Sequence, residues 1–416
     1  MISRFRKKIN SEHVFKLAVL FLPFENFFFA PSSGWATITP IILFIYMLLN
    51  YKILFEYIKK YKKIFLICSC ILFFNIILSL FMYFNLVKII NSMIPIVLGI
   101  TILVSFNIYY QKEKDIKSLS NLIFYSYLVS FFIGVVQFLS IKLDLNFMDT
   151  FFNFIFKRSY FGYNRVQFFF TEPSFIGMHL FGVLFPYYMF TKEKKILGLI
   201  IAFSIASILF SCGVRIILDV FVVLFIFIIS YLIRKKKYIL LIFLPIFSVI
   251  AVGIMSNYNY RVGQIVEKGI YADGSLASRY FRIQSSVYGY IKNPVQTLFG
   301  YGMGNSIIPL RAGYSLAKEK YVSSYVKEVN DLGNPDYFDD SVSYCLYIRF
   351  ISEFGLILFI IVIKWFINIT KNSNMKYKYE YFFVTLYLYL QFESYAFYAL
   401  WLYVLAMLYS QRKLIK

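Results

Sequence analysis

The sequence predicts an all-α polytopic membrane protein, and its composition, its hydropathy pattern and the placement of its charges support that prediction. Hydrophobic residues make up 60% and charged residues 15% of the 416 residues, whereas a soluble domain holds about 45–50% and about 25%. Apolar runs close to the ~20 residues that cross a bilayer recur along the chain. The net charge of +22 comes largely from lysines in the short loops between these runs. The positive-inside rule explains that placement, so we expect the lipid bilayer as a partner and no nucleic acid.

The apolar runs predict about twelve membrane-spanning helices in a single membrane domain over residues 1–416. The runs cover 14–30, 36–56, 64–85, 89–110, 119–141, 174–191, 195–211, 216–233, 238–256, 343–368 and 381–410. The last run is too long for one span, so we expect two short helices that turn near Glu393. The first run follows a basic segment without a small-residue cleavage site, which predicts a retained helix and not a signal peptide.

The basic loops fall on one side of the membrane in this twelve-helix arrangement. The basic segments are 4–8, 59–63, 112–117, 192–195, 234–237, 371–378 and 412–413. The positive-inside rule places them, and both termini, in the cytoplasm. It places a medium loop, 142–173, and a large loop, 257–342, on the outer face. The medium loop is rich in aromatic residues, which predicts a segment that lies in the membrane interface.

Several chemistries have no residues to support them. The chain has no phosphate-binding GxxxxGK[ST] loop, which argues against an ATP-driven pump. Its two histidines, His13 and His179, are too few for a metal site or a Ser-His-Asp triad. We expect His179 to hydrogen-bond between packed helices, and the four cysteines to fill apolar positions. We therefore expect no metal and no cofactor.

Arginines at the predicted outer surface are the main candidates for function. They are Arg165, Arg215, Arg279 and Arg282. A guanidinium group binds phosphate through paired hydrogen bonds and stays charged at any working pH. Arg215 ends the short segment SCGVR between two apolar runs, where a charged residue is by default a functional candidate. For each arginine the alternatives are a structural ion pair or an anchor to lipid phosphates.

The most specific pattern lies in the large loop, in the run SRYFRIQSSVYGYIKNPVQTLFGYGMGN over residues 278–305. It predicts an amphipathic helix that carries Arg279 and ends at Asn293, since a residue before proline leaves the α region. Gly300, Gly302 and Gly304 allow backbone N–H groups to approach a ligand closely, although a simple turn explains them equally well.

This run resembles the outer loop of the O-antigen polymerase and O-antigen ligase superfamily, which are GT-C glycosyltransferases. Two further segments resemble motifs of that superfamily and stand in the same order: RVQFFFTEPSFIG over residues 165–177 and SCGVR over residues 211–215. The resemblance covers roughly residues 165–360. It implies a GT-C-like fold whose active face is the periplasmic side of the bacterial inner membrane.

The resemblance further implies a metal-independent transferase that uses undecaprenyl pyrophosphate-linked oligosaccharide. The growing glycan would move from its carrier onto a lipid-linked repeat unit, and a chain-length regulator protein is a further partner that this activity can have. Arg215 and Arg279 would bind the pyrophosphate, and Arg165 and Arg282 would support it or the second lipid. Glu172 would orient Arg165 or act as the base, with Asp339 or Asp340 as the alternative base. The remaining substrate-binding candidates are Tyr301, Gly302 and Asn305.

One departure favours a Wzy-type polymerase over a ligase. The ligases carry a histidine just before a segment that SEFGL, residues 352–356, resembles, and this chain has Tyr344 or a near neighbour there. A flippase or other transporter is the next alternative and would show more charges at mid-membrane depth. The apolar runs hold few such charges: Lys16, Asp219, Arg349 and Glu393. A structural scaffold is the third alternative, which the outer arginines make unattractive.

Overall fold

The computed structural model describes residues 11–26, 38–112, 116–145, 147–210, 212–258, 260–320, 326–334 and 343–412. Every regular element in these ranges is a helix, as the sequence predicts. The first part of the chain forms α1 (Ser11–Leu20), α2 (Thr39–Leu49), α3 (Tyr51–Lys60), α4 (Lys62–Met82), α5 (Leu86–Lys112), α6 (Ile116–Lys142), α7 (Phe147–Ile155), η2 (Phe161–Tyr163), η3 (Pro173–Phe175), α8 (Ile176–His179), η4 (Leu180–Leu184), α9 (Phe185–Thr191) and α10 (Lys194–Leu209).

The second part of the chain forms the remaining helices. They are α11 (Val214–Arg234), α12 (Tyr238–Tyr258), α13 (Tyr260–Lys268), η5 (Ile270–Ala272), α14 (Gly274–Lys292), α15 (Pro294–Phe299), α16 (Ile308–Lys320), α17 (Lys327–Asp331), α19 (Leu346–Phe354), α20 (Leu356–Lys371), α21 (Lys378–Tyr389) and α22 (Tyr398–Arg412).

Six helical stretches within the described residues are long and apolar enough to cross a membrane. They are Lys62–Met82, Leu86–Gln111, Ser118–Lys142, Pro173–Thr191, Val214–Arg234 and Tyr238–Asn257. Each coincides with one apolar run of the sequence. A seventh counts if α2 and α3 together form one span, although they are bent by 87°. The chain is thus built to span a bilayer several times, while twelve spans and a GT-C arrangement stay predictions.

Other apolar runs do not form one straight helix. The run 36–56 bends between α2 and α3, next to Asn50. The run 343–368 breaks at Gly355, between α19 and α20, where the glycine has a φ of +85°. The run 381–410 divides into α21 and α22, and Glu393 lies between them as expected. The length of the run 381–410 therefore predicted its break, whereas hydropathy did not predict the breaks near Asn50 and at Gly355.

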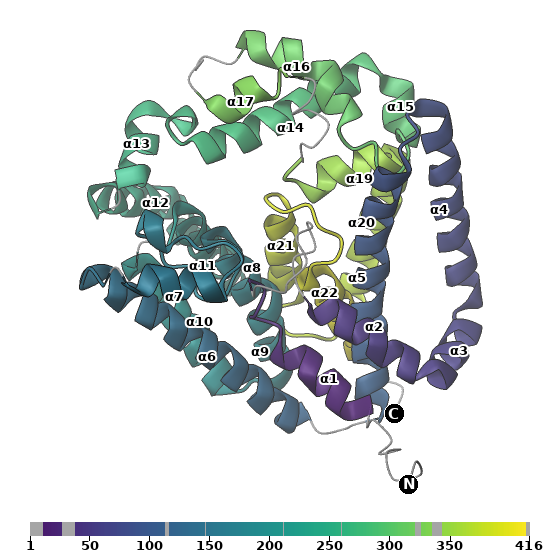
Figure 1. The fold of residues 1–416 in the computed structure, drawn as a ribbon, viewed down its shortest axis with the longest axis horizontal. Helices are drawn as coiled ribbons and strands as arrows, with labels where there is room; N and C mark the ends of the chain where they lie inside the picture. The colour runs from purple at the N-terminus through teal and green to yellow at the C-terminus, as the bar shows by residue number, and fades with distance from the viewer. Residues whose placement is uncertain are drawn as a thin grey trace.

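The elements of the large outer loop gather at one end of the molecule. Helices α14, α16 and α17 lie across that end, whereas α1 and α9 lie toward the opposite end (Figure 1). Buried Phe281, Leu310 and Leu332 form a small separate core there. Helix α14 ends at Lys292 and is capped by Asn293 before Pro294, as the sequence predicts. Helix α21 packs against both α11 and α20, which places it in the middle of the molecule (Figure 1).

The glycine run that follows α15 is a tightly packed turn. The N–H of Tyr301 donates to the Ser352 carbonyl at 2.7 Å, and the Ser79 hydroxyl donates to the Met303 carbonyl at 2.8 Å. Gly302 has a φ of +86°, and a Cβ there would lie 2.5 Å from the backbone nitrogen of Ser79. Asn305 donates from Nδ2 to the carbonyl of Tyr301 at 2.9 Å. Packing of Gly300 against the end of α19, of Gly302 against α4 and of Gly304 against α5 therefore accounts for these glycines without a ligand.

Replacing Gly302 with alanine should destabilise the protein, because the new Cβ meets backbone atoms and the residue must keep a positive φ. Backbone strain and overpacking together predict a loss of about 2–5 kcal/mol. Thermal unfolding of the detergent-solubilised protein measures this as a lower Tm. Gly198→Ala is the matched control, since a Cβ at Gly198 meets nothing within 4 Å. Equal unfolding temperatures for the two variants would contradict the packing explanation.

Candidate anion-binding site

The first two sequence motifs pack against each other at the N-terminal end of α11. Arg165 donates from Nη2 to the carbonyl of Cys212 at 3.1 Å, which joins the two segments directly. Further along, Gly177 lies against Asp219, and a Cβ at Gly177 would be 1.9 Å from Asp219 Oδ2. This glycine thus leaves the space that the aspartate carboxylate occupies. The segments 165–177 and 212–215 are separate in the sequence but contact each other in the fold.

Arg215 lies in the first turn of α11 and is buried, with 6% of its side chain exposed. Among the described residues, its Nε and Nη2 groups have no hydrogen-bond partner. The nearest carboxylate oxygen is Asp219 Oδ2, 4.0 Å from Nε, which is beyond hydrogen-bonding distance. Buried N–H groups normally find a partner, so an unpaired guanidinium calls for an explanation. A bound anion would supply the missing acceptors.

Asp219 is held from the opposite side by α21. The hydroxyl of Tyr387 donates to Asp219 Oδ1 at 2.7 Å, and Gln391 donates to that hydroxyl oxygen at 3.1 Å. The second carboxylate oxygen, Oδ2, has no hydrogen-bond partner within the described part of the chain. Asp219 follows Arg215 by one helical turn, so both project from the same face of α11. The carboxylate therefore offsets the arginine charge without occupying its N–H groups.

The third motif brings more positive charge to the same place. The charge of Arg279, on α14, acts on both Arg215 and Asp219. One turn later on α14, Arg282 is almost fully buried, with 1% of its surface exposed. The guanidinium carbons of Arg279 and Arg282 lie 5.6 Å and 4.8 Å from the ring centre of Tyr344. Residues of all three motifs therefore lie around the start of α11, where the charges of Arg215 and Arg279 both act on Asp219.

Glu172 and Arg165 mark the edge of this cluster. Glu172 accepts from Arg158 Nη1 at 3.0 Å and from the Ser174 hydroxyl at 2.9 Å. Its ion pair is therefore with Arg158 and not with Arg165, which it was predicted to orient. Burial lowers the pKa of Arg165, and the charge of Arg261 lowers it further. The edge of the site is thus also rich in arginine.

A buried network supports the segment that carries Glu172. Glu25 Oε1 lies 2.8 Å from His179 Nε2, and the Tyr127 hydroxyl lies 2.8 Å from His179 Nδ1. The other oxygen of Glu25 accepts from the Thr171 hydroxyl at 3.4 Å. The prediction that His179 hydrogen-bonds between packed helices is confirmed. The imidazole is buried between Tyr127 and Glu25, so it is not placed to act in the arginine cluster.

The predicted site residues thus fall into three groups. The fold gathers Arg165, Glu172, Arg215, Arg279 and Arg282 around the start of α11 and the middle of α14. Three others lie in the packed turn beside α4: Tyr301, Gly302 and Asn305. Asp339 and Asp340 lie outside the described residues. In the described ranges, no three His, Cys, Asp or Glu side chains gather as a metal site requires.

Sequence reasoning missed the supporting roles of Asp219, Tyr387 and Glu393. A signal existed for Asp219, because a carboxylate one turn after an arginine in an apolar helix suggests a pair. No signal pointed to Tyr387, since the chain has 37 tyrosines. Glu393 was noted as the position of a turn between two helices and as one of the few charges in the apolar runs, without a contact to the site.

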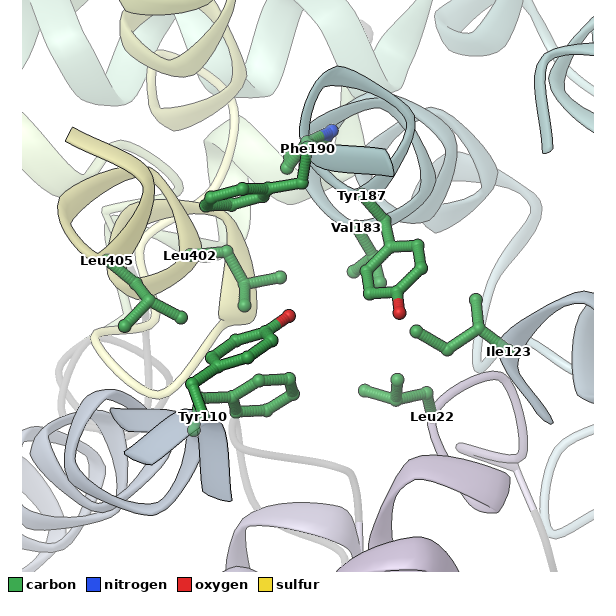
Figure 2. Close-up of a pocket in the computed structure, with 10 residues that line it drawn as sticks. Leu22, Tyr110, Ile123, Val183, Tyr187, Phe190, Leu402 and Leu405 are labelled. Carbon is green, nitrogen blue, oxygen red and sulfur yellow. The ribbon is translucent and has the colours of Figure 1, made fainter. Parts of the chain in front are cut away.

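An internal cavity elsewhere in the fold does not compete with this site. It is lined by Leu22 after α1, Val183 of η4, Leu402 of α22 and other apolar side chains (Figure 2). Its volume is about 10 Å³, which is room for little more than one water molecule. The arginine cluster is therefore the better candidate for a functional site.

The chain matches no protein-family profile, no curated protein and no solved structure. Its function must therefore be inferred from the cluster itself. A buried guanidinium group with unused N–H donors, which Arg215 has among the described residues, suits an anion with several oxygens, such as a phosphate or pyrophosphate.

Proposed function

We propose that the protein is a polysaccharide polymerase of the O-antigen type. It transfers a growing undecaprenyl pyrophosphate-linked glycan onto a lipid-linked repeat unit at the periplasmic face of the bacterial inner membrane. The observation that carries the proposal is the convergence of three motif-like segments around Arg215, whose buried Nε and Nη2 have no partner among the described residues. These are the segments in which the sequence resembles the superfamily.

The chemistry of such a transfer suits an arginine cluster. The acceptor hydroxyl oxygen attacks the anomeric carbon, and the bond from that carbon to the pyrophosphate oxygen breaks. The lipid pyrophosphate leaves with the bonding electrons, so negative charge develops on it in the transition state. Preorganised cations in a site that excludes water stabilise such charge strongly. The hydroxyl proton passes to a carboxylate, for which Glu172 and Asp340 are the candidates.

One observation favours a polymerase over a ligase. The superfamily's ligases are expected to place a histidine near the re-entry point of the large loop, where this chain has Tyr344. His179 is enclosed by Glu25 and Tyr127, and His13 lies in α1, toward the other end of the molecule (Figure 1). No histidine of this chain is therefore placed to serve the arginine cluster.

Replacing Arg279 with alanine should abolish polymer formation while the protein is still made. In a deletion strain complemented with this variant, we expect glycans of a single repeat unit on gels, where the wild type gives a ladder. Lys292→Ala is the matched control, because Lys292 ends the same helix and is exposed. A wild-type ladder from Arg279→Ala would remove Arg279 from the site. If the deletion itself leaves long chains on the carrier lipid, the protein is a ligase.

A further inference from the structure

The chain re-enters the apolar core after the large loop through a short strained junction at Ser343 and Tyr344. Tyr344 has a φ of +57°. Bulky residues adopt this left-handed region rarely, and they persist in it where the surroundings hold them. Such positions cluster at functional sites. The ring of this tyrosine also lies beside the two arginines of α14.

The carboxylate of Glu393 holds this junction. Its Oε2 accepts three hydrogen bonds: from the Ser343 N–H at 2.7 Å, the Ser343 hydroxyl at 2.7 Å and the Tyr344 N–H at 2.9 Å. The adjacent Phe392 carbonyl accepts from the N–H of Leu346 at 3.0 Å. Hydrogen bonds to an ionised acceptor are stronger than neutral ones. Four hydrogen bonds therefore join the break between α21 and α22 to the junction, and three of them come from the backbone N–H groups of Ser343, Tyr344 and Leu346.

The junction in turn positions the arginines. The Tyr344 ring lies close to Arg279 and Arg282, at distances typical of cation–π contacts. The preceding turn of α21 supports the other side of the cluster, since Tyr387 donates to Asp219 beside Arg215. One short segment, residues 387–393, therefore contacts the supports of both the α11 and the α14 arginines.

We propose that Glu393 is a positioning residue of the anion site, and that it acts through Tyr344. By holding the backbone of Ser343 and Tyr344, it keeps the tyrosine ring against Arg279 and Arg282 and so keeps these guanidinium groups directed at the anion. An effect of Glu393 on glycan transfer rests on the proposed function. Its effects on the protection of backbone amides and on pyrophosphate binding do not depend on that function.

Hydrogen exchange tests the contact itself. In purified full-length protein in nanodiscs, Glu393→Ala should speed amide exchange in the peptide that contains Ser343 and Tyr344 by about tenfold or more, as expected when protecting hydrogen bonds are lost. Glu393→Gln should give an intermediate rate, because its amide oxygen still accepts but carries no charge. Ser394→Ala is the matched control, since no hydrogen bond joins Ser394 to the junction within the described residues. Unchanged exchange in both Glu393 variants would overturn the proposal.

Binding of farnesyl pyrophosphate tests the consequence for the site. Glu393→Ala and Tyr344→Leu should each weaken it about tenfold, Glu393→Gln should recover much of the affinity, and farnesol should not bind measurably to any variant. The double variant should be no weaker than either single one, because residues that act through each other are not additive. Additive losses, or faster exchange with unchanged affinity, would overturn the positioning role. If pyrophosphate binding behaves as expected and the wild type makes no polymer, the positioning role stands and the polymerase proposal fails.

Discussion

Arg215→Lys should lower the rate of glycan transfer about 100- to 1000-fold, the loss typical of removing one preorganised donor to a developing anion. Lysine keeps the positive charge but loses the planar fork that pairs with two phosphate oxygens. The rate is measured with purified enzyme and lipid-linked repeat units in nanodiscs. Arg234→Lys, at the other end of the same helix, is the matched control and should leave the rate unchanged. Similar rates for Arg215→Lys and the wild type would exclude Arg215 from binding the leaving group.

Arg215→Ala, alone and combined with Asp219→Asn, separates the role of Arg215 in catalysis from its role in stability. Arg215→Ala leaves the buried carboxylate of Asp219 without its neighbouring cation, and breaking a buried pair this way costs about 3–5 kcal/mol. Adding Asp219→Asn should restore most of the Tm without restoring transfer. If the double variant regains activity, the arginine serves only to balance Asp219.

Gly177→Ala should have the second largest effect, because its Cβ would lie 1.9 Å from Asp219 Oδ2. The carboxylate must move, and with it the hydrogen bond from Tyr387 and the charge beside Arg215. We expect a loss of stability of about 1–3 kcal/mol, as for overpacked cores, together with a strong loss of transfer. Thermal unfolding and the transfer assay measure the two effects, with Gly198→Ala as the control.

A second substitution identifies the cause of the Gly177 effect. Asp219→Ala removes the two atoms nearest to the new methyl group, Oδ2 and Cγ. Gly177→Ala should therefore lower the Tm less in the Asp219→Ala background than in the wild type, and such non-additivity is expected of residues in contact. Because alanine cannot replace the aspartate beside Arg215, transfer should stay low. An equal decrease in Tm in both backgrounds would contradict the contact with Asp219 as the cause.

The sequence predicted which segments form apolar helices better than it predicted where those segments bend or break. Six apolar runs correspond to straight helical stretches of spanning length among the described residues. The run 343–368 reads as one span, yet it breaks at Gly355, whose backbone packs against that of Gly300. Hydropathy sums side-chain preferences over a window, so it does not register a break that arises from contact with a distant segment.

Only part of the candidate site was predictable from the sequence, and the reason is similar. Arginine is uncommon within membrane-spanning segments and on the side opposite to the basic loops, so Arg165, Arg215, Arg279 and Arg282 were identifiable from residue type and position alone. Tyr301, Gly302 and Asn305 belong to a pattern that suits a ligand or a turn, and the fold uses it for a turn against α4. Local spacing does not distinguish these two uses, because both require glycine at a positive φ.

The sequence by itself determined an all-helical membrane protein, its main apolar segments, the end of α14 at Asn293 and the arginines that surround one site. These follow from side-chain chemistry and local backbone preference, which act over a few residues. Only the tertiary structure decided that Glu172 pairs with Arg158 and that Tyr387 and Glu393 support the site, because these contacts depend on how separate segments pack. The support of Asp219 by Tyr387 spans 168 positions in the chain, and that of the Ser343 backbone by Glu393 spans 50. Contacts over such separations exist only once the helices are assembled.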